Sequence, residues 1–221
     1  MEVAPDAWKY AAPPFLLAGP VGLLSPVATL VALGLGVAVL AFFRDPERTP
    51  SGPGVLAPAD GRVSVVREEG DRVRVGVFMN VTDVHVNRAP LGGEVTSVEH
   101  EPGAHRPAFT KESDRNEKVH VRFADHDLTL IAGAFARRIH PYVDAGDSLE
   151  RGDRLGHIAF GSRADVLLPA SLDRSDVRVE TGETVRAGET VVSSVPAFFG
   201  NAEISILTRR TIRGQFAPDG C

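Results

Sequence analysis

One pattern occurs twice in this chain of 221 residues, as Val143-Asp-Ala-Gly146-Asp147-Ser-Leu149-Glu-Arg-Gly152-Asp153-Arg-Leu155 and again as Val179-Glu-Thr-Gly182-Glu183-Thr-Val185-Arg-Ala-Gly188-Glu189-Thr-Val191. In each copy, apolar positions surround two glycines, and each glycine is followed by an acidic residue. Glycine permits the positive φ of tight turns, and the apolar positions between the turns point inward. Such hairpins are the building blocks of lipoyl-like barrel sandwiches. Two copies predict a pseudo-symmetric β core rather than a solenoid, which needs at least about three repeats.

The rest of the chain after residue 44 also has the pattern of short strands. Its apolar runs alternate or are β-branched, and polar or Gly/Pro turns separate them. The runs are Val63–Val66, Val73–Phe78, Val84–Val86, Val119–Phe123 and Leu128–Ile131. No helical period occurs there, and the polar segment 100–118 is expected to be a long loop. We therefore expect residues 55–221 to form one mainly β domain.

The N-terminal part has a different composition, because no charged residue occurs between Lys9 and Arg44. A membrane-spanning helix needs about 20 apolar residues, and prolines interrupt the first half of this stretch. The clearest helical piece is Val27–Phe43, and a first helix around Phe15–Leu24 would be shorter. Two short helices joined near Ser25-Pro26 would make a hairpin that enters one leaflet. One helix preceded by an irregular segment is the alternative.

These features predict a membrane-associated helical segment over residues 1–43. A buried core hairpin and a signal peptide are the ordinary alternatives, but the basic start typical of a signal peptide is missing. Residues 44–54 hold three prolines and two glycines and are expected to be a linker. We expect the chain at the cell membrane, with the β domain on the cytoplasmic side.

Composition excludes some classes of function. The net charge of −5 does not predict a surface for nucleic acid. The single cysteine, Cys221, is the last residue, so it cannot form an internal disulfide and is a poor candidate for thiol catalysis.

The sequence Phe160-Gly161-Ser162 lies between two apolar runs, Leu155–Phe160 and Val166–Pro169. A serine directly after a glycine suits a self-cleaving chain, because the glycine leaves its carbonyl unshielded and the serine Oγ can attack it. That reaction would convert Ser162 into a pyruvoyl group. A Gly-Ser pair alone is weak evidence, since it is common in turns.

Six further segments strengthen this interpretation. Together with Phe160–Arg163, and in this order, they resemble the short-form phosphatidylserine decarboxylase family, including archaeal relatives that act on archaetidylserine. The resemblance covers roughly residues 40–195. The segments are Phe42–Arg48, Ala57–Val63, Asp83–Pro90, Ser113–Glu117, Gly133–Ile139 and Gly182–Thr190.

The resemblance implies a proenzyme that cleaves itself between Gly161 and Ser162 and then decarboxylates a serine-headed membrane phospholipid to its ethanolamine counterpart. The two cleavage fragments would remain together as a heterodimer, which could dimerise further. Losing CO₂ from an amino acid requires an electron sink, and the pyruvoyl group would be that sink. Pyridoxal phosphate needs a lysine, and outside the N-terminus only Lys111 and Lys118 occur, both in the polar loop. We therefore expect no pyridoxal phosphate.

The resemblance also implies an Asp–His–Ser arrangement that activates Ser162. Asp60 corresponds to the aspartate, although Asp-Gly is also a common hairpin turn. His85 corresponds to the histidine, although a lone strand histidine is often a packed core residue. Bacterial and mitochondrial relatives carry His-Arg-Val-His here, whereas this chain has His85-Val-Asn-Arg88. Either His85 serves both cleavage and decarboxylation, or His100 supplies the second histidine.

Arg88, Arg137 and Arg138 are candidates for the substrate phosphate, because arginine presents a bidentate fork to phosphate oxygens; a solvated strand end is the alternative. No metal is expected, since no His or Cys spacing resembles a ligand set. Asn116 and Glu117 belong to the family pattern without an evident mechanism.

The rival function is a membrane-anchored, non-catalytic lipoyl-like binding module. A lipoyl-type carrier is disfavoured, because its hairpin tip needs a lysine and neither repeat contains one.

Overall fold

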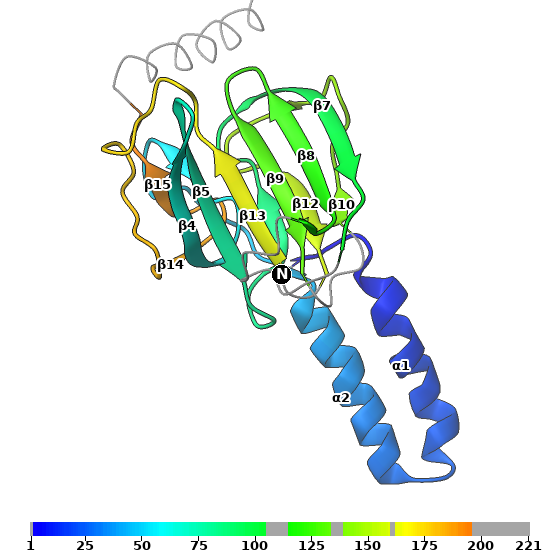
Figure 1. The fold of residues 1–221 in the computed structure, drawn as a ribbon. Coiled ribbons are helices and arrows are strands. Elements are labelled where there is room, and N and C mark those ends of the chain that lie inside the picture. The colour runs from blue at the N-terminus through cyan, green and yellow to red at the C-terminus, as the bar shows by residue number, and fades with distance from the viewer. Residues whose placement is uncertain (1, 105–114, 134–138, 160–161, 196–221) are drawn as a thin grey trace, which may run out of the picture.

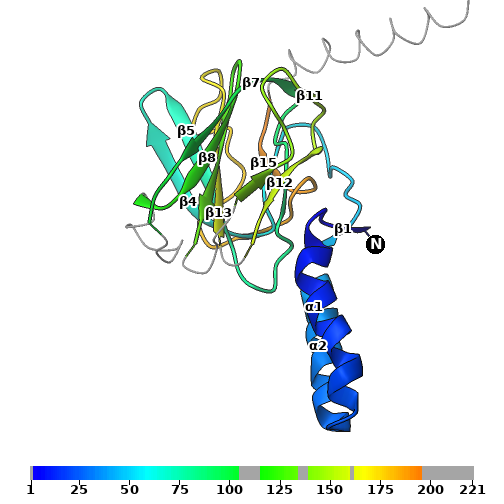
Figure 2. The same ribbon diagram turned by 90° about the vertical axis from the view of Figure 1, so that its right-hand side faces the viewer.

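The computed structural model describes residues 2–104, 115–133, 139–159 and 162–195. A body of β-strands carries a pair of helices that projects from one end, and both views show the tip of this pair far from the strands (Figures 1 and 2). The helices are α1 (Ala7–Gly22) and α2 (Pro26–Phe42). The strands are β1 (Glu2–Val3), β2 (Arg44–Asp45), β3 (Val55–Leu56), β4 (Gly61–Glu69), β5 (Arg72–Met79), β6 (Val86–Arg88), β7 (Gly93–Glu101), β8 (Lys118–Phe123), β9 (Asp127–Ala132), β10 (Ile139–Pro141), β11 (Ser148–Leu149), β12 (Arg154–Ile158), β13 (Ser162–Leu167), β14 (Thr184–Val185) and β15 (Val191–Ser193).

The largest sheet has the antiparallel order β11-β7-β8-β9-β13-β5-β4-β14 and curls into a half-barrel (Figure 1). Two small sheets, β10-β12-β6 and β15-β3, contribute to the same apolar core. Leu155 and Ile158 of β12 and Val192 of β15 are buried there with the inward side chains of the large sheet. The mainly β prediction is confirmed, and in the described residues both helices precede residue 44. The closer likeness to lipoyl-like sandwiches stays a prediction.

The repeated pattern forms the turns that its glycines predict. All four glycines have positive φ, with 95° at Gly146, 93° at Gly152, 99° at Gly182 and 69° at Gly188. The first copy places β11 between its turns, and the second copy places β14 there. The two copies therefore share one backbone course.

Each copy pairs with a partner segment, and the two partner segments also resemble each other. The first copy pairs with Ala89-Pro-Leu-Gly-Gly-Glu-Val95 and the second with Ala57-Pro-Ala-Asp-Gly-Arg-Val63. The amides of Gly152 and Gly188 donate to the carbonyl oxygens of Ala89 and Ala57, at 2.9 and 3.0 Å. The core is therefore pseudo-symmetric, as expected, and includes a second repeat, Ala-Pro-x-x-Gly-x-Val, that the sequence analysis missed.

The N-terminal segment forms two helices joined near Ser25-Pro26, so the alternative of one helix after an irregular segment is wrong. The expected start of the first helix is also wrong, because α1 begins at Ala7 and contains Pro13, Pro14 and Pro20. The two helices pack closely, and this packing compensates for the prolines in α1. The contact is so close that a side chain at Gly36 of α2 would overlap the Phe15 ring of α1. No helix in the described residues combines the length and apolarity needed to cross a membrane.

Residues 44–54 are extended and packed on the body rather than forming a free tether. Arg44 and Asp45 pair with β1, and the Asp45 carboxylate binds Arg88 and Arg154. Further along, Arg48 binds Asp60 through both carboxylate oxygens. The segment therefore fixes the helical pair to the β body.

Gly61, at the start of β4, should be the glycine least tolerant of a side chain. Its φ is +138°, and a Cβ there would overlap the Phe78 carbonyl oxygen. Gly146 also has a positive φ of +95°, but nothing lies within 4 Å of its Cβ position. We expect Gly61→Ala to lower the free energy of unfolding by at least about 3 kcal/mol and Gly146→Ala by about 1–2 kcal/mol. Urea unfolding would measure both, and equal losses would contradict the packing argument.

Candidate active site

Ser162 is the first residue of β13, the strand that lies between β5 and β9. It is fully buried and stands opposite Met79 on one side and Ala132 on the other. Side chains alternate along a strand, so Ser162 shares the core side with Ala164 and Val166. Its Oγ lies 3.8 Å from the Met79 sulfur. That is a weak contact, and among the described residues the buried hydroxyl has no stronger partner.

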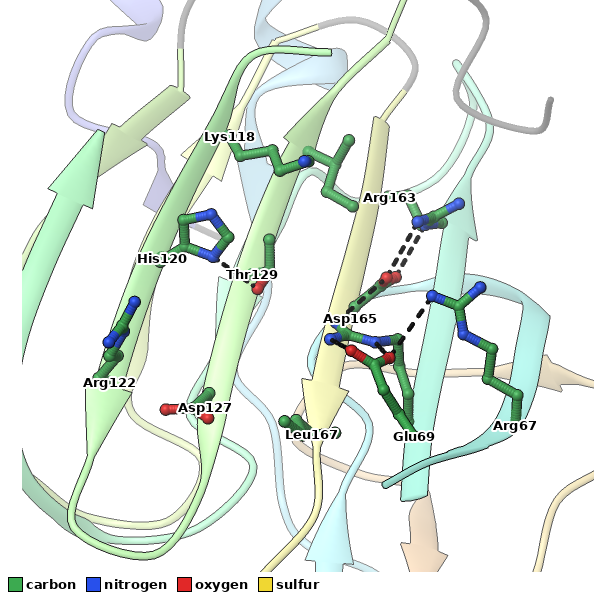
Figure 3. A pocket seen from close by; sticks show the side chains of 12 residues that line it. Arg67, Glu69, Lys118, His120, Arg122, Asp127, Thr129, Arg163, Asp165 and Leu167 are labelled. Carbon is green, nitrogen blue, oxygen red and sulfur yellow. Dashed lines mark hydrogen bonds and ion pairs between the residues drawn. The ribbon is translucent and has the colours of Figure 1, made fainter. Parts of the chain in front are cut away.

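The opposite face of the same strand carries charge. Arg163 and Asp165 point into a hollow of about 340 Å³ on the outer face of the sheet (Figure 3). They form a bidentate pair of 2.8 and 3.0 Å, and Arg74 lies 3.7 Å from the same carboxylate. Burial raises the pKa of Asp165, against the charge of Arg163. These side chains neutralise one another, and they lie across the sheet from the Ser162 side chain.

Asp60 precedes β4 at the same end of the sheet as Ser162. The β4 strand pairs with β5, which places the start of β4 beside Met79, the partner of Ser162. The Asp60 carboxylate accepts hydrogen bonds from Arg48, at 2.8 and 3.0 Å, and from the Ala187 amide, at 2.8 Å. Burial raises the pKa of Asp60 and outweighs both of these partners. In the described contacts, Asp60 joins the Arg48 side chain to the Ala187 backbone. Its role in orienting a base stays a prediction.

His85 is buried immediately before β6, with its ring 4.3 Å from that of Phe42 at the end of α2. Its Nδ1 lies 2.9 Å from the Asp83 carbonyl oxygen, so in the described chain that oxygen, rather than Asp60, orients the ring. A carbonyl can only accept, so Nδ1 carries the proton and Nε2 presents a lone pair. Burial lowers the pKa of His85 to about 4. His85 is therefore neutral near pH 7 and able to accept a proton.

Asn87 is a site residue that the sequence analysis missed. It is fully buried, its Nδ2 lies 3.7 Å from the Met79 sulfur, and its Oδ1 has no hydrogen-bond partner among the described residues. Ser162 Oγ contacts the same sulfur. The sequence signal that could have identified Asn87 is its position in the Asp83–Pro90 segment, two residues after His85.

Asn116 and Glu117 fix the strand opposite Ser162. Asn116 is buried and donates from Nδ2 to the Ala132 carbonyl oxygen at 2.7 Å, and the Ala132 amide donates to the Glu117 carbonyl oxygen at 3.0 Å. Because Ala132 stands opposite Ser162, these contacts define the end of β9. The family pattern at this place thus has a structural explanation.

The other predicted residues have different outcomes. His100 is exposed at the end of β7, with its Nε2 2.8 Å from Glu117 Oε1. Arg88 is buried, and its guanidinium donates to Asp45 at 2.6 Å and to the carbonyl oxygens of Pro46 and Gly152. These contacts fix the Arg88 guanidinium among protein groups, and its role as a ligand of the substrate phosphate stays a prediction. The cleavage residue Gly161 and the phosphate candidates Arg137 and Arg138 lie outside the described residues.

One group of side chains has a composition suited to a metal, namely Asp6, His140 and His157. The two imidazole rings are stacked, with centroids 4.7 Å apart and planes inclined by 12°. A metal binds along the nitrogen lone pair, in the plane of each ring. Two nearly parallel stacked planes share no such position, so this arrangement does not fit a metal.

The sequence of this chain is similar to those of several known proteins. A family model described as phosphatidylserine decarboxylase matches residues 35–193. A Halobacterium salinarum protein, provisionally named archaetidylserine decarboxylase proenzyme, is 60% identical over 86% of this chain and 97% of its own length. The phosphatidylserine decarboxylase proenzyme of Streptomyces avermitilis is 51% identical over 72% of this chain and 75% of its own. No solved structure matches this chain.

Burial of His85 should make stability depend on pH. Its pKa of about 4 lies below the ordinary 6.5, so the unfolded chain takes up the proton first as the pH falls. The contribution of His85 to the free energy of unfolding is therefore fully present above pH 6.5. It declines by roughly 3 kcal/mol as the pH falls from 6.5 to about 4, and then levels off. In a Ser162→Ala background, which is expected to keep the chain intact, His85→Phe should remove that part of the decline in urea unfolding. Parallel pH curves for the two proteins would contradict the assignment.

Proposed function

The chain belongs to the phosphatidylserine decarboxylase family, and we propose that it is a proenzyme that cleaves itself before Ser162 and then decarboxylates a serine-headed phospholipid to its ethanolamine counterpart. The observation that carries the proposal is the position of Ser162. It is the first residue of a central strand, it is buried, and no strong hydrogen bond from the part of the chain that the structure describes holds its Oγ. Its hydroxyl is therefore available for an intramolecular attack from which water is excluded.

The chain's own residues can perform the first step. The Nε2 atom of His85 is unprotonated and buried, without a partner among the described residues, and we propose that it accepts the proton of Ser162 Oγ. The oxygen of Ser162 then bonds to the carbonyl carbon of the preceding residue, and the peptide bond is exchanged for an ester. Elimination then removes the α-proton of residue 162 and breaks its Cβ–O bond, which releases residues 1–161 with a terminal carboxylate and leaves a dehydroalanine at the start of residues 162–221. Water then adds to the tautomeric imine of this dehydroalanine, ammonia leaves, and a pyruvoyl group results.

The second fragment would then begin with a pyruvoyl group derived from Ser162, which would supply the electron sink for loss of CO₂. The surroundings fit such a group, because the Ser162 position is dry and Asn87 Oδ1 and His85 Nε2 are buried polar atoms without described partners. For the decarboxylation, we assign His85 to hold or return a proton and Asn87 to orient polar atoms of the headgroup. A non-catalytic binding module would give no reason for two unsatisfied polar atoms in this place.

The helical pair suits a lipid substrate. Many of its large apolar side chains are exposed, most strongly at the tip, where Leu23 and Leu24 are 90% and 87% exposed. Each helix is about 24 Å long, which exceeds one leaflet of hydrocarbon, about 15 Å, but not the whole bilayer core. Trp8 and Tyr10 are exposed near the base, where aromatic residues favour a membrane interface. We propose that the pair enters one leaflet of the cell membrane from the cytoplasmic side.

Mass spectrometry of the purified protein tests the proposed function. The wild-type chain should give two fragments, and the smaller should begin with a pyruvoyl group at position 162 and resist Edman degradation. Ser162→Ala should remain a single chain of 23.6 kDa without decarboxylase activity. A small fragment that sequences normally from serine would exclude the pyruvoyl group, and an intact wild-type chain would favour the binding module.

Vesicle flotation tests the role of the helical pair. Leu23→Asp combined with Leu24→Asp should reduce flotation with phospholipid vesicles at least about tenfold, because charge at the centre of a leaflet is costly, while self-cleavage continues. Thr184→Asp adds a charge to an exposed position of β14 on the body and is the matched control. If the double variant floats as well as the control, the helical pair does not enter the membrane.

A further inference from the structure

The first residue of β13 presents a backbone amide as well as a side chain, and the register of the sheet fixes what that amide faces. In an antiparallel pair of strands, hydrogen-bonded and non-hydrogen-bonded residue pairs alternate. The Leu168 amide donates to the Val73 carbonyl oxygen at 2.9 Å. Ser162 and Met79 lie six positions from that pair in an unbroken register, so they too form a hydrogen-bonded pair. The Ser162 amide therefore faces the Met79 carbonyl oxygen.

The strand on the other side of Ser162 offers its amide no backbone partner. Ala132 of β9 stands opposite Ser162, but both of its backbone groups point away from β13. Its amide donates to the Glu117 carbonyl oxygen at 3.0 Å, and its carbonyl oxygen accepts from Asn116 Nδ2 at 2.7 Å. Within the described ranges, the Met79 carbonyl oxygen is therefore the backbone acceptor that faces the nitrogen of residue 162.

The backbone around Met79 is closely packed. A Cβ at Gly61 of β4 would overlap the Phe78 carbonyl oxygen and would lie 3.2 Å from Met79 Cα. Met79 is itself fully buried, and its sulfur contacts Ser162 Oγ. An acceptor that is fixed and buried needs no reorganisation when charge develops beside it.

The maturation proposed above changes the atom that faces Met79. The nitrogen of residue 162 leaves as ammonia, and an oxygen from water takes its place on the same Cα. A hydrogen-bond donor is thereby replaced by an acceptor, while the Met79 carbonyl oxygen stays an acceptor. The ladder bond at this end of β13 is lost, and two buried acceptors face each other, which is unfavourable.

We propose that the backbone carbonyl of Met79 is a catalytic group of the decarboxylation, which accepts a hydrogen bond from the substrate nitrogen once that nitrogen has replaced this oxygen. The inference rests on the proposed function. An ammonium group carries three hydrogens; two of them leave with the displaced oxygen as water, and the third stays on the nitrogen together with the positive charge. The Met79 carbonyl thus regains a donor, and the new hydrogen bond is charge-assisted.

This contact favours the form of the substrate that reacts. Only a nitrogen that keeps its proton draws strongly on the electron pair released by loss of CO₂, and the Met79 carbonyl stabilises the protonated form. Because the N–H is directed toward β5, the bond from the nitrogen to the rest of the substrate points away from that strand. A headgroup with a quaternary nitrogen has no N–H and cannot restore the contact.

Carbon-13 in the methionine carbonyls tests the proposal directly, because methionine occurs only at positions 1 and 79. Met79→Leu assigns the Met79 resonance by its loss. In detergent, this resonance should lie downfield in uncleaved Ser162→Ala, which keeps the amide at position 162, and should move upfield in the cleaved wild-type protein. An ethanolamine phospholipid, which has no CO₂ to lose, should return it downfield. A choline phospholipid with the same chains is the matched control and should leave it in place.

An ester bond after Met79 weakens its carbonyl as an acceptor and tests the contribution to binding. Lactic acid at position 80 is compared with Asn80→Ala, from which it differs only in the ester. Phenyllactic acid in place of Phe78 is the matched control, because it weakens the Val77 carbonyl, which faces Ala164 in the same ladder. Reduction by cyanoborohydride traps the ethanolamine phospholipid on the small fragment for mass spectrometry. We expect the concentration for half-maximal trapping to rise about tenfold with the first ester and less than about twofold with the control ester.

The ester at position 80 also removes an amide that donates to Asp83 Oδ2 at 2.7 Å. Asp83→Ala removes that bond alone and should trap the phospholipid as the wild-type protein does. A Met79 resonance that is the same before and after cleavage, or that responds equally to both phospholipids, would overturn the proposal, as would equal effects of the two esters. If the wild-type chain never cleaves, the proposed function fails and this proposal fails with it. If it cleaves and the resonance does not return with the ethanolamine phospholipid, only the role of Met79 fails.

Discussion

The pairing of β13 with both β5 and β9 is the constraint on which the rest of the site depends. It fixes Ser162 opposite Met79 and Ala132 at one end of the large sheet. A slip of one residue would turn Ser162 toward the charged outer hollow and bring Arg163 into the core. The Arg163–Asp165 pair opposes that slip, because the slip would move two charged side chains from the polar outer hollow into the apolar core. The pair thus specifies the register of the strand that presents the serine.

The second constraint is the attachment of the helical pair. Asp45 bonds to Arg88 of β6 and Arg154 of β12, which ties the segment after α2 to the strands beside His85 and His157. Phe42 and Phe43, at the end of α2, supply the apolar environment of those histidines. An apolar surround lowers the pKa of both His85 and His157 to about 4, with burial as the main cause. The exposed helical pair and the proposed reaction centre are therefore built on one junction.

The sequence could predict the parts of the fold that depend on local geometry. The four glycines of the repeat required positive φ, and the uncharged N-terminal stretch required helices. It could not predict where α1 begins, because helix packing compensates for the prolines. The similarity of Ala57–Val63 and Ala89–Val95 is short and becomes evident only when each segment is seen against its copy of the repeat. The family pattern assigns Ser162, Asp60 and His85, and their roles stay predictions, whereas the position of Asn87 beside Met79 depends on contacts between distant strands.

Asp60 shows how an important residue can act without touching the reacting atoms. Its carboxylate joins Arg48, from the segment after α2, to the Ala187 amide of the second repeat. It does so at the start of β4, which pairs with the end of β5 beside Ser162. Within the described ranges, the Ser162 hydroxyl has only a sulfur contact. A nucleophile held by strong hydrogen bonds would be stabilised in its resting state, so the rigid contacts lie around Ser162 rather than on it. This division explains a precursor that is well packed and yet contains a serine free to react.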